Sequence, residues 1–169
     1  RSHRAGEITA QRVGDEVVLG GWVQRRRDHG GVIFVDLRDR EGLVQIVFKP
    51  DTSPECHEKA GALRSEYVIL VRGRVQRRSP ETVNAKLPTG EVEVRAKEVR
   101  VLNEAKTPPF SIAEDQNVSE ETRLKYRYLD LRRPQLQHNI GLRHRITMAL
   151  RKYFDQEGFY EIETPILTK

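Results

Sequence analysis

The sequence predicts a mainly β protein, a five-stranded barrel with one intervening helix, followed by a helical segment. Apolar and polar residues alternate with a period of two over residues 17–48 and 67–102, and both stretches are rich in valine and isoleucine. Such alternation is typical of strands with one buried face. From Ser119 onward the alternation is replaced by apolar residues at helical spacing.

Five strands are expected, with turns of identifiable chemistry between the first three. The pairs Gly30-Gly31 and Glu41-Gly42 mark these tight turns. The strands are expected over residues 16–27, 31–39, 42–48, 67–78 and 91–102. A helix is expected within 54–66, where apolar residues stand at helical spacing and Pro54 suits a first turn. Three strands, a helix and two strands form the layout of an OB-fold, a Greek-key barrel.

The chain divides into three predicted parts. Residues 1–104 form the OB domain, residues 105–133 a linker or hinge that begins near the break at Pro108-Pro109, and residues 134–169 the start of a further domain. In that last part a helix is expected from Pro134 to Gln156, and a strand from Phe159 to Glu163.

Composition limits the classes of function. The chain has 30 Lys and Arg against 25 Asp and Glu, a net charge of +5, which favours a polyanionic partner such as nucleic acid. A single cysteine, Cys56, excludes an internal disulfide and a cysteine-cluster metal site. No apolar run approaches the ~18 residues of a membrane helix, and residues 1–4 lack the apolar core of a signal peptide. We expect a cytoplasmic protein with no membrane partner and no metal.

Strand alternation separates a core face from an outer face. In the second strand Ile33 and its alternate neighbours form the core set, so Phe34 shares the opposite face with charged groups. The same reasoning directs Gln45 outward in the third strand. It also places Arg78 and Glu93 on the outer face, and the first strand ends in Arg25-Arg26-Arg27 at the lip of the turn.

This outer face suits single-stranded RNA. A ring stacks on an unpaired base, arginines bind phosphates, and Gln45 can both donate to and accept from a base edge. Ionised Glu93 only accepts, which selects a base with amino and imino donors such as guanine. Each feature has a simpler explanation: Phe34 as a rim residue, solvated arginines, and Glu93 paired with a cross-strand arginine. Their combination on one face favours RNA binding.

Several long motifs resemble bacterial aspartyl-tRNA synthetases. They are RRRDHGGVIFVDLRDREGLVQIVF (25–48), TGEVEV (89–94), KTPPF (106–110), LKYRYLDLRRP (124–134) and GFYEIETPILTK (158–169). The resemblance implies a class II synthetase whose N-terminal OB domain binds the anticodon.

The resemblance also implies roles for single residues. Phe34 would stack on the central uracil, Gln45 would contact the same base, and Glu93 would bind the wobble guanine or its queuosine derivative. Arg27 and Arg78 would support the anticodon loop.

The segment 158–165 resembles class II motif 1, which implies a homodimer interface containing Gly158, Phe159 and Pro165. An ordinary helix, turn and strand is the alternative. The full enzyme would use ATP and Mg²⁺ to attach aspartate to tRNA-Asp. The motifs that hold ATP are absent from this sequence, so we expect no catalytic residue and no cofactor in it.

His29 in the first hairpin turn resembles relatives that charge both tRNA-Asp and tRNA-Asn, although a turn histidine without a role in recognition is the alternative. Two other functions stay open at this stage. One is a free-standing OB protein that binds single-stranded nucleic acid, against which residues 111–169 count. The other is an assembly role in which dimerisation is primary and RNA contact incidental.

Overall fold

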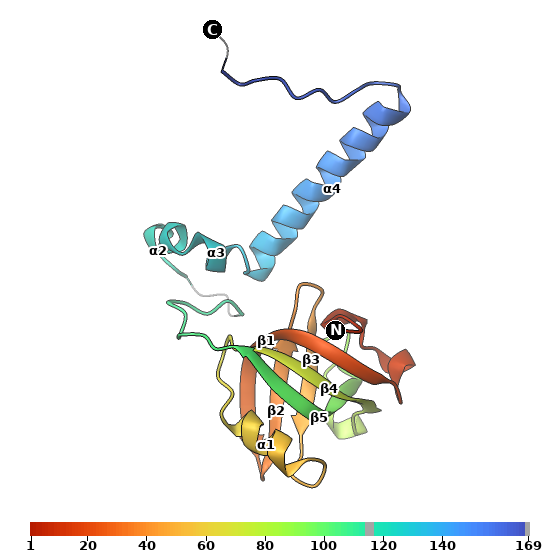
Figure 1. Ribbon diagram of the computed structural model, residues 1–169, viewed down its shortest axis with the longest axis vertical. Helices are drawn as coiled ribbons and strands as arrows, with labels where there is room; N and C mark the ends of the chain where they lie inside the picture. Colours follow the sequence, from red (N-terminus) through yellow and green to blue (C-terminus); the bar gives the residue numbers. More distant parts are fainter. Residues whose placement is uncertain (114–116, 168–169) are drawn as a thin grey trace. The chain divides into compact units, whose positions relative to one another are not determined.

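The computed structural model describes residues 1–113 and 117–167. The chain forms two compact units, Arg1–Pro109 and Phe110–Lys169 (Figure 1). The boundaries expected near residues 104 and 133 stay predictions about domains, because compactness alone does not define a domain.

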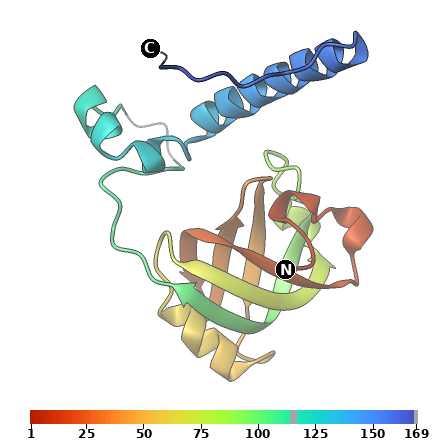
Figure 2. The same cartoon turned by 45° about the horizontal axis from the view of Figure 1, so that its top comes forward.

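The first unit is a closed five-stranded barrel in the order β1-β2-β3-β5-β4 (Figures 1 and 2). Strands β3 and β5 pair in parallel, and the other four neighbouring pairs of the barrel are antiparallel. The strands are β1 (Glu16–His29), β2 (Val32–Arg38), β3 (Leu43–Phe48), β4 (Val68–Arg77) and β5 (Val92–Asn103). Short 3₁₀ turns lie at Ala5–Glu7, Ala10–Arg12 and Pro80–Thr82. The predicted fold class is confirmed, with strand ends within a few residues of those expected.

The β1–β2 hairpin closes through a two-residue loop. Gly30 and Gly31 both have positive φ, 59° and 79°. A two-residue loop with positive φ at both positions matches the right-handed twist of the strands, and glycine adopts that conformation without a Cβ penalty. His29 and Val32, which flank the loop, are paired across the hairpin.

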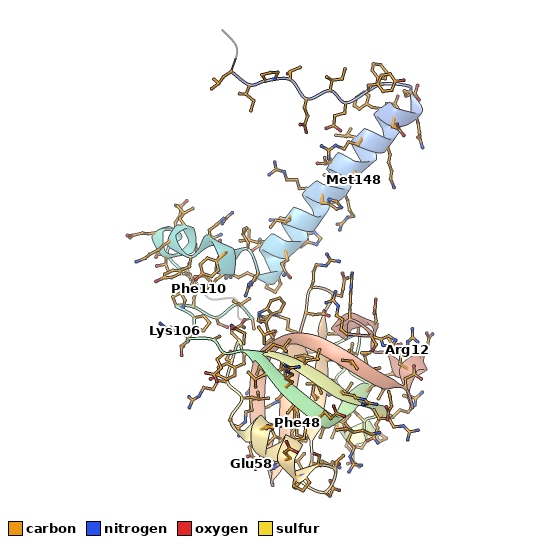
Figure 3. The ribbon with its side chains drawn as sticks, in the orientation of Figure 1. Arg12, Phe48, Glu58, Lys106, Phe110 and Met148 are labelled. Carbon is orange, nitrogen blue, oxygen red and sulfur yellow. The ribbon has the colours of Figure 1, made fainter. Side chains whose placement is uncertain are left out.

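The barrel core consists of the alternate residues predicted for it. Ile33, Val35 and Leu37 of β2 are at most 2% exposed. Phe48, labelled in Figure 3, is 1% exposed and lies within the barrel core. Arg12 and Glu58, labelled in the same figure, are exposed outside it. Burial of these aliphatic side chains contributes about 1.5–3 kcal/mol each to folding. At Gly73 of β4 a Cβ would approach the Arg95 carbonyl oxygen to 2.4 Å, so a glycine permits the close contact with β5.

The helix α1 (Pro54–Gly61) lies across one end of the barrel (Figure 1). Its N-cap is Ser53, whose hydroxyl accepts a hydrogen bond from the Cys56 amide at 3.2 Å. Cys56 and Ala60 are buried, and they belong to the same core cluster as the strands. The helix ends at Gly61, five residues before the end of the predicted region.

The second unit contains α2 (Glu120–Lys125), α3 (Arg127–Asp130) and α4 (Pro134–Gln156). Ser119 caps α2, with its hydroxyl 3.4 Å from the Thr122 amide. Phe110, Ile112 and Leu129 form a small core. None of the residues of α4, all of which the structure describes, is buried.

Asp130 connects the short helices of this unit. It is fully buried and accepts hydrogen bonds from Arg123 at 3.1 Å and from Arg127 at 2.6 Å. Burial acts to raise the pKa of Asp130, but the Arg123 hydrogen bond and the neighbouring arginine charges outweigh it and lower the pKa below its ordinary value.

The prediction of a strand from Phe159 to Glu163 is wrong. These residues have no regular structure, and the exposed fractions of Phe159 and Tyr160 are 64% and 91%. A strand requires a neighbour to satisfy its backbone groups, and the described residues of the second unit include no other strand. Instead, Glu161 accepts hydrogen bonds from Arg151 of α4 at 2.8 Å.

Burial raises the pKa of the Cys56 thiol to about 11. Because the folded pKa exceeds the unfolded value of about 8.5, the folded state retains the thiol proton more strongly. This contribution to stability is present below that unfolded value and is lost as pH rises through the folded pKa. We therefore expect Cys56 to react slowly with a thiol reagent at pH 8, and rapidly once urea unfolds the chain. Equal rates in the two states would contradict this burial.

Candidate nucleic-acid interface

The predicted RNA-binding residues of β1 and β2 lie opposite one another on the outer face of the barrel. Arg27 pairs with Phe34, and Arg25 pairs with Asp36. On the other edge of β2, Asp36 lies opposite Gln45 of β3. Phe34 is partly exposed, so its ring is held between strands and still open to solvent.

A bulge in β1 determines this arrangement. The register against β2 shifts between Val23 and Arg25, so one residue of β1 has no direct partner. Before the shift, Val23 is fully buried in the core; after it, Arg25 and Arg27 share the outer face with Phe34. Bulges re-aim side chains in this way.

The intervening residue, Arg26, serves a different purpose. Its partner in β2 is the core residue Val35, and its Nε donates to the Ala60 carbonyl oxygen at the end of α1, at 3.2 Å. Arg26 thus ties the strand to the helix across the end of the barrel. The three consecutive arginines are therefore not equivalent, and two of them face the candidate interface.

Four polar side chains from four strands form a connected set, which we call the outer-face network: Arg27, Asp36, Gln45 and Glu93. Arg27 Nη2 donates to Asp36 Oδ1 at 2.8 Å and to Gln45 Oε1 at 3.2 Å. Gln45 Nε2 donates to Glu93 Oε2 at 3.0 Å. The amide thus has its oxygen toward a cation and its nitrogen toward an anion, as the charges require.

The network changes the expectation for Gln45. The residue lies on the outer face as predicted, but it is only 6% exposed because Arg27 and Glu93 flank its amide. It is therefore held in one orientation. The bond that Glu93 accepts comes from this amide and not from a cross-strand arginine.

Arg78 lies one residue beyond β4 and beside the network. Its backbone amide donates to the Glu91 carbonyl oxygen at 2.9 Å, and its Nε donates to the Val92 carbonyl oxygen at 3.0 Å. Burial lowers the pKa of the Arg78 guanidinium, against the opposing effect of the Glu93 and Asp36 carboxylates. An arginine still keeps its charge under these conditions. A cation is therefore placed beside the two carboxylates of the face.

The other predicted residues lie outside the network. Arg25 and His29 are exposed on the β1–β2 hairpin. Gly158, Phe159 and Pro165 are exposed in the second unit.

Asp36 is the one member of the outer-face network that the sequence did not single out as a candidate. The alternation of β2 placed it on the outer face, but nothing in the sequence showed its pairing with Arg27. Its side chain is 18% exposed, against 37% for Arg27.

The groups available on this face suit recognition of a nucleic acid. It offers a ring for stacking, an oriented amide, a carboxylate acceptor and cationic groups. Across residues 1–113 and 117–167, no group of three or more His, Cys, Asp or Glu side chains is arranged to hold a metal ion. Within the same residues no helix has the length and apolar character of a membrane span.

A closed five-stranded barrel with an outer face of this composition defines an OB-fold nucleic-acid-binding domain. The chain belongs to this family, because the model of the OB-fold nucleic acid binding domain matches residues 17–102. A second family model, the class II tRNA synthetases (D, K and N), matches residues 119–169.

The individual relatives agree with both matches. Over 169 residues the chain is 56% identical to the aspartate–tRNA(Asp/Asn) ligase of Halothermothrix orenii and 59% identical to that of Moorella thermoacetica. These alignments cover 100% of this chain and 29% and 28% of the two relatives. The resemblance to aspartyl-tRNA synthetases, predicted from the sequence motifs, is confirmed. The chain spans less than a third of the length of those relatives.

Solved structures share the fold. The asparaginyl-tRNA synthetase of Pyrococcus horikoshii aligns with a TM-score of 0.82 and 29% identity, over 99% of this chain and 38% of that one. An aspartyl-tRNA synthetase of Entamoeba histolytica aligns with a TM-score of 0.86 at 21% identity, over 99% of this chain and 40% of that one, which shows the fold alone.

The partly exposed ring of Phe34 leads to a direct prediction. Phe34→Leu keeps apolar bulk but removes the stacking face, and we expect it to weaken binding of an RNA hairpin loop by about 1–3 kcal/mol. Phe34→Tyr keeps the ring and should bind nearly as the original chain does. Fluorescence anisotropy at fixed salt measures both. Equal loss in the two variants would show that the ring acts through packing rather than stacking.

Proposed function

We propose that this chain binds the anticodon loop of a tRNA on the outer face of its barrel. The observation that carries the proposal is the outer-face network, which holds an amide and a carboxylate in defined orientations beside a partly exposed ring. A merely basic surface would not need an oriented amide. The matches to an OB-fold nucleic-acid-binding family and to a tRNA synthetase family support the same conclusion.

Each residue has a proposed role. Phe34 stacks on the central base, and Gln45 contacts the edge of that base. Glu93 accepts hydrogen bonds from a guanine at the wobble position, since an ionised carboxylate has no donor of its own. Arg25, Arg27 and Arg78 provide positive charge near the phosphates of the loop.

We further propose that the tRNA partners are tRNA-Asp and tRNA-Asn, with His29 beside the base that distinguishes them. The relatives named aspartate–tRNA(Asp/Asn) ligases support this pair. His29 is exposed at the tip of the β1–β2 hairpin, from which a side chain can reach a bound loop. If the chain strictly prefers one of the two tRNAs, His29 does not have the proposed role in accepting both.

We propose that the full-length enzyme with such an N-terminal part uses ATP and Mg²⁺ to attach aspartate to tRNA. Residues 1–104 would bind the anticodon, and residues 134–169 would begin the catalytic domain. Residues 105–133 would link these two domains. The exposed apolar side chains of α4 and the segment with Gly158, Phe159 and Pro165 are proposed to contribute to a homodimer interface. The fractions exposed at Ile146 and Leu150, 52% and 53%, support a covering partner.

A free-standing OB protein is the alternative function, and the match of residues 119–169 to a synthetase family counts against it. A purely structural role is weakened by the outer-face network, because assembly requires no oriented base-recognising groups.

Three RNA hairpins test the proposed function by anisotropy at one stated salt concentration: the aspartate anticodon loop, the asparagine anticodon loop and a scrambled loop. We expect both anticodon loops to bind more tightly than the scrambled one. Two versions of the aspartate loop, with guanine or adenine at the wobble position, measure the preference for guanine, which Glu93→Gln should reduce by roughly 1–3 kcal/mol, about 5- to 150-fold in the ratio of dissociation constants.

Glu98→Gln is the matched control. Glu98 also lies on β5 and is paired with a strand arginine, Arg72 at 3.3 Å, but it is outside the network. It removes the same charge and should leave the guanine preference unchanged. Equal binding of the three loops, lost together as salt rises, would mean that the face is only a basic surface and would sink the proposal.

A further inference from the structure

We propose that Asp36 is a positioning residue that sets the base selectivity of the interface by holding Arg27 and, through it, the amide of Gln45. The inference rests on the proposed function, since it concerns how the same face discriminates between bases.

The first step is how Arg27 is held. Among the described residues, every hydrogen bond of its side chain is made by Nη2, to Asp36 and to Gln45. Its Nε is buried and has no hydrogen-bond partner in the described part of the chain. Asp36 is thus the charged partner of the guanidinium, at 2.8 Å, whereas Gln45 is a neutral partner at 3.2 Å. Both bonds have an ionised donor, but only Asp36 adds the attraction of an opposite charge, and its bond is the shorter of the two, so Asp36 dominates the position of Arg27.

The second step is the orientation of the amide. A glutamine side chain can turn its oxygen and nitrogen around by rotation about one bond. At Gln45 one orientation gives two favourable contacts, oxygen toward Arg27 and nitrogen toward Glu93. The reverse orientation would direct NH₂ at a guanidinium and an oxygen at a carboxylate. The preference therefore depends on Arg27 staying in place.

The third step is that Asp36 is poorly placed to contact RNA itself. Its side chain is 18% exposed, about half the value for Arg27. It is also an anion on a face that would bind phosphates, so its direct effect on RNA is repulsive. A carboxylate retained there lowers overall affinity while it fixes the groups that distinguish one base from another.

These opposing effects make the inference testable. In Asp36→Asn we expect weaker discrimination between an anticodon loop with a central uracil and one with a central cytosine, by about fivefold, the loss of one well-oriented hydrogen bond. Affinity for a scrambled loop should stay constant or rise, because a negative charge is removed. A residue with only a structural role would lower the affinity for all three loops together.

The double variant shows whether Asp36 acts through Arg27. In an Arg27→Ala background, adding Asp36→Asn should change the discrimination ratio no further. A further fivefold loss in the double variant would show that Asp36 acts independently, and the inference would be wrong. An unchanged ratio in Asp36→Asn alone would also overturn it. Glu98→Gln again serves as the charge control.

A readout without RNA separates this inference from the proposed function. In ¹⁵N-labelled chain, the side-chain NH₂ of Gln45, identified by its loss in Gln45→Glu, should exchange with solvent faster in Asp36→Asn. If it does not, the inference fails whatever the RNA shows. If it does, and the original chain prefers no loop, Asp36 still positions the amide and only the proposed function fails.

Thermal unfolding confirms that each variant is folded before it is compared. Asp36→Glu provides a second variant if Asp36→Asn does not fold. It keeps the charge and moves the carboxylate by one methylene, so we expect the same direction of change, a reduced ratio and faster exchange. No change in either quantity would count against the inference.

Discussion

The pairing register of β1 against β2 is the constraint on which the rest of the interface depends. Side chains alternate between the two faces of a strand, so a shift of one residue exchanges the two sets. Without the shift between Val23 and Arg25, Arg26 would lie opposite Phe34, and Arg27 would move to the opposite face. The bulge lets one strand contribute Val23 to the core and Arg27 to the outer-face network.

Selectivity and affinity make opposite demands on this face. Positive charge near phosphates supplies affinity regardless of sequence, and a basic chain has that charge to offer. The outer-face network instead includes two carboxylates, Asp36 and Glu93, which repel a polyanion. In the proposed function, Asp36 orients Arg27, and Glu93 accepts hydrogen bonds from a base. Unfavourable elements of this kind are a common means of discrimination, because they penalise the wrong partner more than the right one.

Much of the fold followed from period-two alternation, and the reasons for the exceptions are physical. The core set of β2 and the outward position of Phe34 depend only on residue spacing, so they could be predicted. The burial of Gln45 and the pairing of Asp36 depend on β1, β3 and β5 meeting around the barrel, and spacing within one strand contains no such information. The strand expected from Phe159 failed because strand formation depends on a partner strand and not on local sequence alone.

The two units differ in how they obtain stability. The barrel buries an aliphatic core contributed by all five strands and by α1, and every residue of this core lies in the first unit. In the second unit three apolar residues and the buried carboxylate of Asp130, with its arginine partners, hold α2 and α3 together, whereas the 23 residues of α4 bury none of their side chains. An isolated helix gains little in water without packing of its apolar face. The exposed apolar residues of α4 therefore fit the proposed covering partner, whereas the barrel presents the proposed base-recognising groups on a core that lies within the first unit.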